Sequence, residues 1–208
     1  GTAYPFKYND TKSFLRLINK HKNRVGAVVL ETVRNYYPEK GFIQTIRNVT
    51  QDLKIPLVLD EVTSGFRLNI GGAHLLFNLK PDIAVFAKGI SNGFPMAAII
   101  GRKSVMGVAQ DTFISSTYWT ERIGPAAALA TIRKMKDRKV PLHLIRIGKR
   151  VQAGWKNSAL RHGVKIEVCG IAPLGHFSFL YENPLVLKTL FTQFMLKKGF
   201  LATTVFYA

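Results

Sequence analysis

The sequence predicts an α/β fold, in which a mostly parallel sheet carries helices on both faces and a smaller α+β unit follows. Short continuous apolar runs, typical of strands buried in a parallel sheet, alternate with segments whose apolar residues recur at helical spacing. The 208 residues, 47% of them hydrophobic, are sufficient for a sizeable core. The composition changes near Val140, which predicts a larger domain over 1–139 and part of a smaller domain over 140–208.

Three helices and four strands are expected in the larger domain. Asn9-Asp10 resembles a helix cap, and apolar residues then recur at helical spacing as far as His21. A second helix is expected over 41–54 and is stopped by Pro56, and an alanine-rich stretch over 125–135 predicts the third. The predicted strands are the apolar runs 25–30, 57–59, 83–86 and 96–100.

The smaller domain is expected to contain two helices and three strands. Apolar residues spaced from Leu144 to Trp155 predict an amphipathic helix. The remaining predicted elements are strands over 164–168, 177–181 and 200–205 and a helix over 185–197. Because Ala208 directly follows an apolar run with no polar tail, we expect this domain to be incomplete.

The formal net charge of +18 would fit a nucleic-acid or acidic-surface partner. The cations are scattered, however, and no run interleaves basic and aromatic residues as a base-stacking surface does. We therefore expect a basic, solvated exterior and no nucleic-acid partner. No apolar run approaches the roughly 18 residues of a membrane helix, so no membrane partner is expected. The single cysteine, Cys169, fits a reducing compartment and hence a cytoplasmic location.

Asp60 and Lys88 are the most informative residues, because each follows a short apolar run that is predicted to be a buried strand. In a parallel sheet the carboxyl ends of the strands form the ligand-binding edge. A carboxylate there can hold a protonated ring nitrogen, and an amine can form an imine with an aldehyde. These are the two contributions that a protein makes to a pyridoxal 5'-phosphate (PLP) site.

Each of the two residues also has a plainer interpretation. Lys88 could be a lysine at a strand end with its amine in water. Asp60 and Glu61 could be solvated, cap a neighbouring helix or hold magnesium. Neighbours on an extended strand point to opposite faces, so the two carboxylates would not share one ion. One acid that faces the site and one that faces away suit a single ring-nitrogen contact better.

Three further residues are candidates for the same site. Val62 would lie on the same face as Asp60 and press against a flat ring, although core packing explains it equally well. Thr117 offers a hydroxyl to a phosphate near the start of the third helix, or belongs to an ordinary capping cluster. Glu31 ends a predicted strand and faces the same crevice, or forms a salt bridge with Arg34 or Arg67. The five histidines have no metal-ligand spacing, so no metal site is expected.

Three segments in this order resemble the motifs of class III aminotransferases. The aspartate motif is LVLDEVTSGFR over 57–67, and the lysine motif is PDIAVFAKGISNGFP over 81–95. A later motif, STYWTERIGP over 116–125, resembles the one whose threonine reaches the cofactor phosphate of the neighbouring subunit. Asp60 and Lys88 are 28 residues apart, as in that family. Within the family, the sequence is most similar to the branch of glutamate-1-semialdehyde aminomutase-like proteins.

The resemblance implies a fold-type I PLP enzyme that forms a homodimer with active sites at the subunit interface. It implies that Lys88 binds the cofactor aldehyde, Asp60 holds the ring nitrogen, Val62 packs on the ring and Thr117 binds phosphate. The implied reaction transfers an amino group between a small-molecule amino donor and an oxo acceptor. Lys88, once freed, would move the proton between the substrate and cofactor carbons. Migration of the amino group within one molecule, as in a 2,1-aminomutase, is the alternative reaction.

The chain departs from the family pattern before its first matched motif. The family has an aromatic ring-stacking residue and a glycine/serine phosphate cup upstream of the matched region, and neither occurs here. We therefore expect a fragment or truncated product that binds PLP weakly or not at all by itself. Strong visible absorbance of a lysine–PLP imine in the purified chain would contradict this. A non-catalytic remnant that serves as a dimerisation or binding module, and a nucleic-acid-binding protein, are the competing interpretations.

Overall fold

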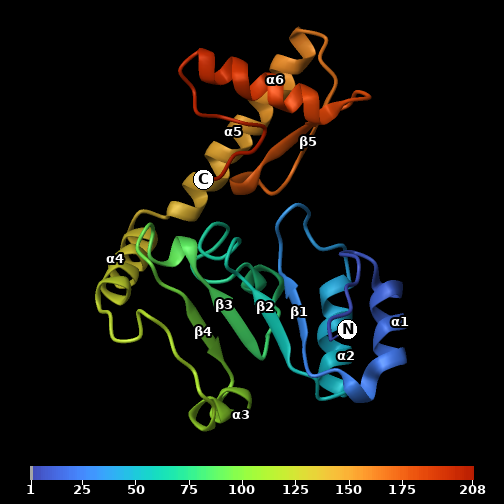
Figure 1. Ribbon diagram of the computed structural model, residues 1–208, viewed down its shortest axis with the longest axis vertical. Helices are drawn as coiled ribbons and strands as arrows, with labels where there is room; N and C mark the ends of the chain where they lie inside the picture. The colour runs from blue at the N-terminus through green and yellow to red at the C-terminus, as the bar shows by residue number, and fades with distance from the viewer. Residues whose placement is uncertain (1) are drawn as a thin grey trace. The chain divides into compact units, whose positions relative to one another are not determined.

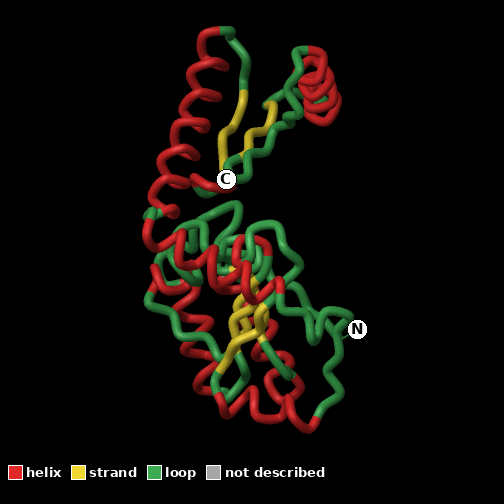
Figure 2. Tube along the Cα trace, turned by 90° about the vertical axis from the view of Figure 1, so that its left-hand side faces the viewer, coloured by secondary structure: helices red, strands yellow, loops and turns green. Residues whose placement is uncertain are grey.

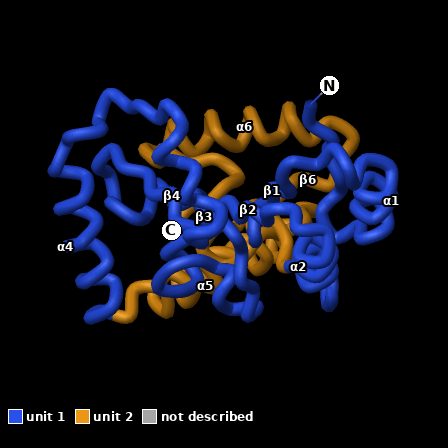
Figure 3. The backbone as a smooth tube through the Cα atoms, turned by 90° about the horizontal axis from the view of Figure 1, so that it is seen from below, with its two compact units in different colours: residues 1–33, 38–138 blue, residues 34–37, 139–208 orange. Residues whose placement is uncertain are grey.

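The computed structural model describes residues 2–208, which form two compact units. The first unit comprises residues 1–33 and 38–138, and the second comprises residues 34–37 and 139–208 (Figure 3). The short loop 34–37 therefore belongs with the second unit although it follows the first strand of the first unit.

The first unit is built on a four-stranded sheet with the order β1-β2-β3-β4 (Figure 1). The strands are β1 (Val28–Glu31), β2 (Leu57–Asp60), β3 (Ile83–Phe86) and β4 (Ala98–Gly101). The pairs β1–β2 and β2–β3 are parallel, whereas β4 runs antiparallel to β3. The prediction of a mostly parallel sheet is therefore confirmed, with an antiparallel strand at one edge.

The three predicted helices of this unit are present, and their ends follow from local sequence. They are α1 (Thr11–His21), α2 (Phe42–Asp52) and α4 (Ile123–Asp137), and a short α3 (Lys103–Met106) adds a fourth. Short 3₁₀ turns also occur at η1 (Lys22–Arg24), η2 (Ala73–Phe77), η3 (Lys88–Ile90) and η4 (Gly107–Asp111). The Asp10 carboxylate caps α1 by accepting a hydrogen bond from the Ser13 amide at 2.9 Å. Helix α2 ends where Lys54 adopts a left-handed conformation with φ 55° just before Pro56.

The core of the first unit lies where helices cover one face of the sheet. Side chains from α1 and α2 pack against alternate residues of β1 and β2, and α4 packs against β3. The buried residues of the first cluster include Phe14, Ile18, Val28, Leu30, Phe42, Ile46, Leu57 and Leu59. Those of the second are Phe66, Ala84, Phe86, Ile90 and Ala128. Val29 and Ile99 of the edge strands are each 60% exposed, so the sheet is open to solvent at these two positions.

The second unit packs helices against an antiparallel hairpin (Figure 2). Its elements are α5 (Val140–Arg161), β5 (Ile166–Cys169), η5 (Ala172–Leu174), β6 (His176–Phe179) and α6 (Pro184–Lys197). The ring of Phe177 contacts Trp155 of α5 at 5.1 Å and Phe191 of α6 at 5.4 Å between centroids. At Gly148 a Cβ atom would lie 1.8 Å from the Ala172 carbonyl oxygen, so only glycine at this position lets α5 pack this closely against η5.

The predicted strand over 200–205 is wrong. This segment makes an isolated bridge between His176 and Val205, and its Thr204 carbonyl accepts a backbone hydrogen bond from Phe177, but it forms no continuous ladder with β6 in the described residues. Leu201 is 98% exposed, which shows that the apolar run is not packed on both sides as a buried strand would be. No helix of residues 2–208 has the length and apolar character that a membrane crossing requires.

Asp82, directly before β3, joins the starts of β2 and β3 and the end of β4 to helix α2. Its buried carboxylate accepts hydrogen bonds from the Leu57 amide at 2.9 Å, from Arg47 at 2.7 Å and from Arg102 at 3.0 Å. Burial raises the pKa of Asp82, but the Leu57 amide and the Arg47 guanidinium outweigh burial and leave this pKa below its usual value.

This lowered pKa predicts an acid-dependent loss of stability. A carboxylate with a depressed folded-state pKa stabilises the fold above its unfolded-state pKa, about 3.9 for aspartate, and this contribution is lost as pH falls through the folded-state value. We therefore expect Asp82→Asn to reduce the change in unfolding free energy between pH 7 and pH 3. Urea unfolding at several pH values measures it. An unchanged pH dependence in Asp82→Asn would contradict the assignment.

Candidate active site

The candidate residues lie at the carboxyl edge of the parallel strands. Glu31 at the end of β1 is in register with Asp60 at the end of β2, and Asp60 is in register with Val85 of β3. The Glu61 amide continues the ladder by donating to the Val85 carbonyl at 2.8 Å. Lys88 follows β3 by two residues, so the strand ends bring Glu31, Asp60 and Lys88 to one edge of the sheet.

Lys88 begins η3 and is held in an uncommon backbone conformation. Its φ of 49° lies in the left-handed region, which a lysine adopts at a cost of about 1–3 kcal/mol, and such strain is concentrated at functional sites. The side chain is exposed, and its Nζ donates to the Thr63 hydroxyl at 3.0 Å. Thr63 comes three residues after Asp60 and is buried. The amine is thus directed at the segment that follows Asp60.

Asp60 and Val62 are both half-buried, and one hydrogen bond orders them. The Val62 amide donates to Asp60 Oδ1 at 2.8 Å. This contact fixes the carboxylate plane, and a carboxylate with one oxygen engaged keeps the capacity to accept a further hydrogen bond at the other oxygen. Such a fixed acceptor suits a ring N–H.

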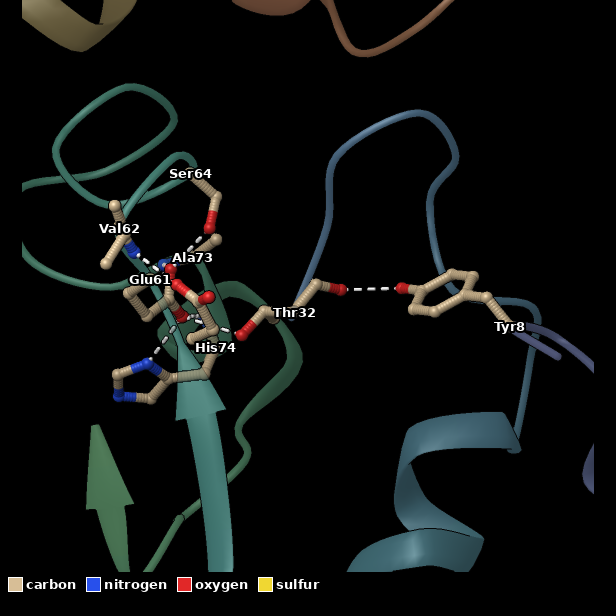
Figure 4. A network of polar contacts seen from close by, with 8 residues as sticks. Tyr8, Thr32, Glu61, Val62, Ser64, Ala73 and His74 are labelled. Carbon is tan, nitrogen blue, oxygen red and sulfur yellow. Dashed lines mark hydrogen bonds and ion pairs between the residues drawn. The ribbon is translucent and has the colours of Figure 1, made fainter. Parts of the chain in front are cut away.

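Glu61 is the centre of a buried polar network (Figure 4). The side chain is fully buried, at 0% exposure. Oε1 accepts from the Thr32 hydroxyl at 2.8 Å and the His74 amide at 2.9 Å and lies 2.8 Å from His74 Nδ1. Oε2 accepts from the Ser64 hydroxyl at 2.7 Å and the Ala73 amide at 2.9 Å. The second acid of the motif is thus surrounded by five hydrogen-bonding groups.

These donors decide the charge state of Glu61. Burial alone raises the pKa of its carboxyl, but the hydrogen bonds from the side chains of His74 and Ser64 and from the amides of His74 and Ala73 outweigh it and leave the pKa lowered. The carboxylate is therefore ionised in the folded protein at neutral pH. Because an ionised carboxylate only accepts hydrogen bonds, His74 carries its proton on Nδ1.

Glu31 and Thr117 lie in different surroundings. Glu31 is half-buried, and its charge, after burial itself, raises the pKa of the Tyr8 phenol, which donates to the Thr32 carbonyl at 2.6 Å. Thr117 is exposed in a turn before α4. Within the described part of the chain no hydrogen bond joins Thr117 to Asp60 or Lys88.

Sequence reasoning missed Thr63, His74 and Gly72. Glu61 directly follows Asp60 and Thr63 comes three residues after it, and this closeness in the sequence is the signal that could have indicated Thr63. His74 is 13 residues downstream of Glu61, and only the folded chain returns it to the strand end. At Gly72 a Cβ atom would lie 2.2 Å from the His74 ring, so glycine leaves room for this contact. No cluster of three or more residues with metal-binding side chains occurs in residues 2–208.

Comparison with known proteins identifies the family. The family model described as "Aminotransferase class-III" matches residues 5–177, most of the chain. The chain belongs to the class III aminotransferases. Both the aspartate motif around Asp60 and the lysine motif around Lys88 fall inside the matched range.

Relatives and a solved structure agree with this family. The chain is 35% identical, over 66% of its length and 34% of the relative, to glutamate-1-semialdehyde 2,1-aminomutase of Nitrosopumilus maritimus. It is 26% identical, over 92% of its length and 48% of the relative, to 3-aminobutyryl-CoA aminotransferase of Cloacimonas acidaminovorans. The PLP internal aldimine form of the FumI protein of Sphingopyxis sp. MTA144 superposes with a TM-score of 0.91 at 25% identity.

That superposition covers 98% of this chain and 50% of the FumI chain, so the predicted α/β fold of type I is confirmed. The chain spans half or less of the length of each of these relatives.

Proposed function

We propose that this protein transfers an amino group between an amino donor and an oxo acceptor with PLP as its cofactor. The observation that carries the proposal is the hydrogen bond from Lys88 Nζ to Thr63, which directs the amine at the segment that follows Asp60. The family match over 5–177 supports it. We further propose that the two units correspond to parts of the larger and smaller domains predicted from the sequence.

The residues present fit this cofactor. Lys88 supplies an accessible primary amine on a strained backbone, and Asp60 supplies a carboxylate already held by the Val62 amide. When bound, PLP supplies an electron sink for the carbanion that forms at the substrate carbon.

We assign each residue one role. The Asp60 carboxylate accepts a hydrogen bond from the ring nitrogen and keeps it protonated, and Val62 lies against the ring. The Lys88 amine holds the aldehyde carbon and, once released, carries the substrate proton as general base and acid. Glu31 shapes the same edge of the sheet from β1.

We propose a second copy of this chain as the partner that completes the site. The turn that carries Thr117 exposes large apolar side chains: Phe113 is 96% exposed and Trp119 is 67% exposed. Exposed apolar residues grouped in this way are typical of protein interfaces. Contact with a second copy would bury them and bring the Thr117 hydroxyl to the phosphate of the neighbouring site. A cytoplasmic location agrees with the one free cysteine, Cys169.

A 2,1-aminomutase is the second candidate activity. The relative of this name is 35% identical to the chain over 143 residues. Product analysis separates the two activities, because a mutase returns one isomeric amino compound and consumes no separate oxo acceptor.

The proposal predicts that Lys88 is the lysine that PLP modifies. Treatment with PLP and then borohydride converts an imine into a stable pyridoxyl-lysine that peptide mapping locates. We expect the label on the peptide that contains Lys88, in preference to other exposed lysines such as Lys80 and Lys103, even where PLP affinity is low. Label spread over the surface lysines without preference for Lys88 would favour a non-catalytic remnant and contradict the proposal.

A further inference from the structure

We propose that Glu61 is a positioning residue for Lys88, which acts by fixing the segment 62–64 so that the Thr63 hydroxyl holds the Lys88 amine. This inference rests on the proposed function, since it assigns Lys88 a reacting amine. It gives a role to a carboxylate that does not itself reach Lys88 and that the proposed reaction leaves unused.

The Lys88 amine requires a contact that holds it in one orientation. Its side chain is exposed, and a lysine side chain loses up to about 2 kcal/mol of rotamer entropy when it is held in one place. The hydrogen bond to Thr63 at 3.0 Å is the contact that orients it. Thr63 is itself 4% exposed, so its hydroxyl is a fixed acceptor rather than a mobile one.

Glu61 holds the chain on the C-terminal side of Thr63. On the side chain, Glu61 Oε2 accepts from the Ser64 hydroxyl at 2.7 Å, directly after Thr63. On the main chain, the Glu61 carbonyl accepts from the Gly65 amide at 2.8 Å. Before Thr63, the Val62 amide is bound by Asp60. Thr63 is therefore flanked by a contact to Asp60 before it and by contacts to Glu61 after it, and the Ser64 contact is the one that depends on the Glu61 carboxylate.

The Glu61 carboxylate also joins three segments of the first unit. Thr32 follows β1, Ser64 lies after β2, and Ala73 and His74 belong to η2 (Figure 4). Each segment donates to Glu61 at 2.7–2.9 Å. Loss of the carboxylate thus releases the support of the 62–64 segment together with its neighbours.

The substitution Glu61→Gln tests the positioning role of the Glu61 carboxylate. Oε1 faces the His74 amide and Oε2 faces the Ala73 amide, and both amides are donors. Whichever way a glutamine side chain turns, its NH₂ group meets a backbone N–H, so Glu61→Gln keeps the shape and breaks the network. Thr63→Val removes only the hydroxyl that meets Lys88. Ser64→Ala removes one donor and serves if Glu61→Gln does not fold.

A matched control lies at the other edge of the same sheet. Asp82 is also a buried carboxylate with several donors, but it precedes β3, whereas Lys88 follows it. Asp82→Asn is expected to lower stability and to leave Lys88 unaffected. A merely structural role of Glu61 would make the two variants behave alike.

The experiment measures the order of Lys88 without cofactor. Carbon-13 relaxation at the lysine Cε atoms, with Lys88 assigned by Lys88→Arg, reports how far each amine is held. We expect Lys88 to be more ordered than exposed Lys80 in the wild type and Asp82→Asn. In Glu61→Gln, Thr63→Val and, in part, Ser64→Ala, the order of Lys88 should fall towards that of Lys80. Unchanged order in Glu61→Gln and Ser64→Ala, or an equal loss in Asp82→Asn, would overturn the proposal.

PLP trapping on Lys88 gives the second readout. A lost hydrogen bond is expected to slow borohydride-trapped labelling of Lys88 by about three- to tenfold in Glu61→Gln and Thr63→Val, and not in Asp82→Asn. If Lys88 order responds as predicted but the wild type traps no PLP on Lys88, the positioning role stands and the proposed function fails. If trapping is selective in the wild type but no slower in these variants, the positioning role fails and the proposed function stands.

Discussion

Replacing Lys88 with methionine is expected to lower the rate of amino-group transfer by about 10²–10⁴-fold, the range typical of removing a general base or acid. Methionine keeps an unbranched apolar stem and removes the nucleophilic nitrogen. Since Lys88 is exposed and its amine makes one hydrogen bond, to Thr63, the fold should tolerate the change. The measurement is the rate of oxo-product formation by the PLP-loaded protein with an amino donor and an oxo acceptor.

Two further variants test whether the reaction needs the Lys88 amine itself, and not its positive charge or any exposed lysine. Lys88→Arg keeps the positive charge but not a deprotonatable amine, so it should be as slow as Lys88→Met. Lys80→Met removes an exposed lysine from the opposite end of β3 and should retain the wild-type rate. A Lys88→Met protein as active as Lys80→Met would show that Lys88 is not the reacting lysine.

Replacing Glu61 with leucine is expected to destabilise the protein by about 3–5 kcal/mol. Leucine fills a similar volume but accepts no hydrogen bond, so the hydroxyls of Thr32 and Ser64 and the amides of Ala73 and His74 remain buried without a partner. Each such donor costs about 1–3 kcal/mol when it is left unsatisfied. Urea unfolding at pH 7 measures the free energy of unfolding.

Glu39 provides the matched control for this variant. It is exposed, and Glu39→Leu should change the free energy of unfolding by no more than about 0.5 kcal/mol. A Glu61→Leu protein as stable as Glu39→Leu would mean that the buried network contributes nothing net to the fold.

Much of the sheet could be predicted because its strands are short apolar runs with clear limits. The run 57–59 lies between Pro56, which helix α2 cannot continue through, and Asp60, and β3 coincides with the predicted 83–86. The antiparallel direction of β4 leaves no mark in its own residues, since direction depends on the path of the connecting chain. The run 200–205 has the composition of a strand. It does not form one, because it pairs with the backbone of the second unit through an isolated bridge at Val205 and not through a ladder.

The site could be predicted only where its residues adjoin a strand end. Asp60, Val62 and Lys88 follow apolar runs in the sequence, so their shared edge of the sheet was accessible to reasoning. The donors to Glu61 come from Thr32, Ser64, Ala73 and His74, which lie up to 42 positions apart in the chain and meet only after folding. A buried carboxylate and a solvated one look alike in sequence, because what distinguishes them is the set of partners.

A crystal structure of the borohydride-reduced PLP derivative tests the central assignment most directly. The account predicts that PLP is joined to Lys88 Nζ, with an Asp60 carboxylate oxygen about 2.7–2.9 Å from the ring nitrogen. PLP joined to another lysine, or a ring nitrogen that faces a group other than Asp60, would contradict it.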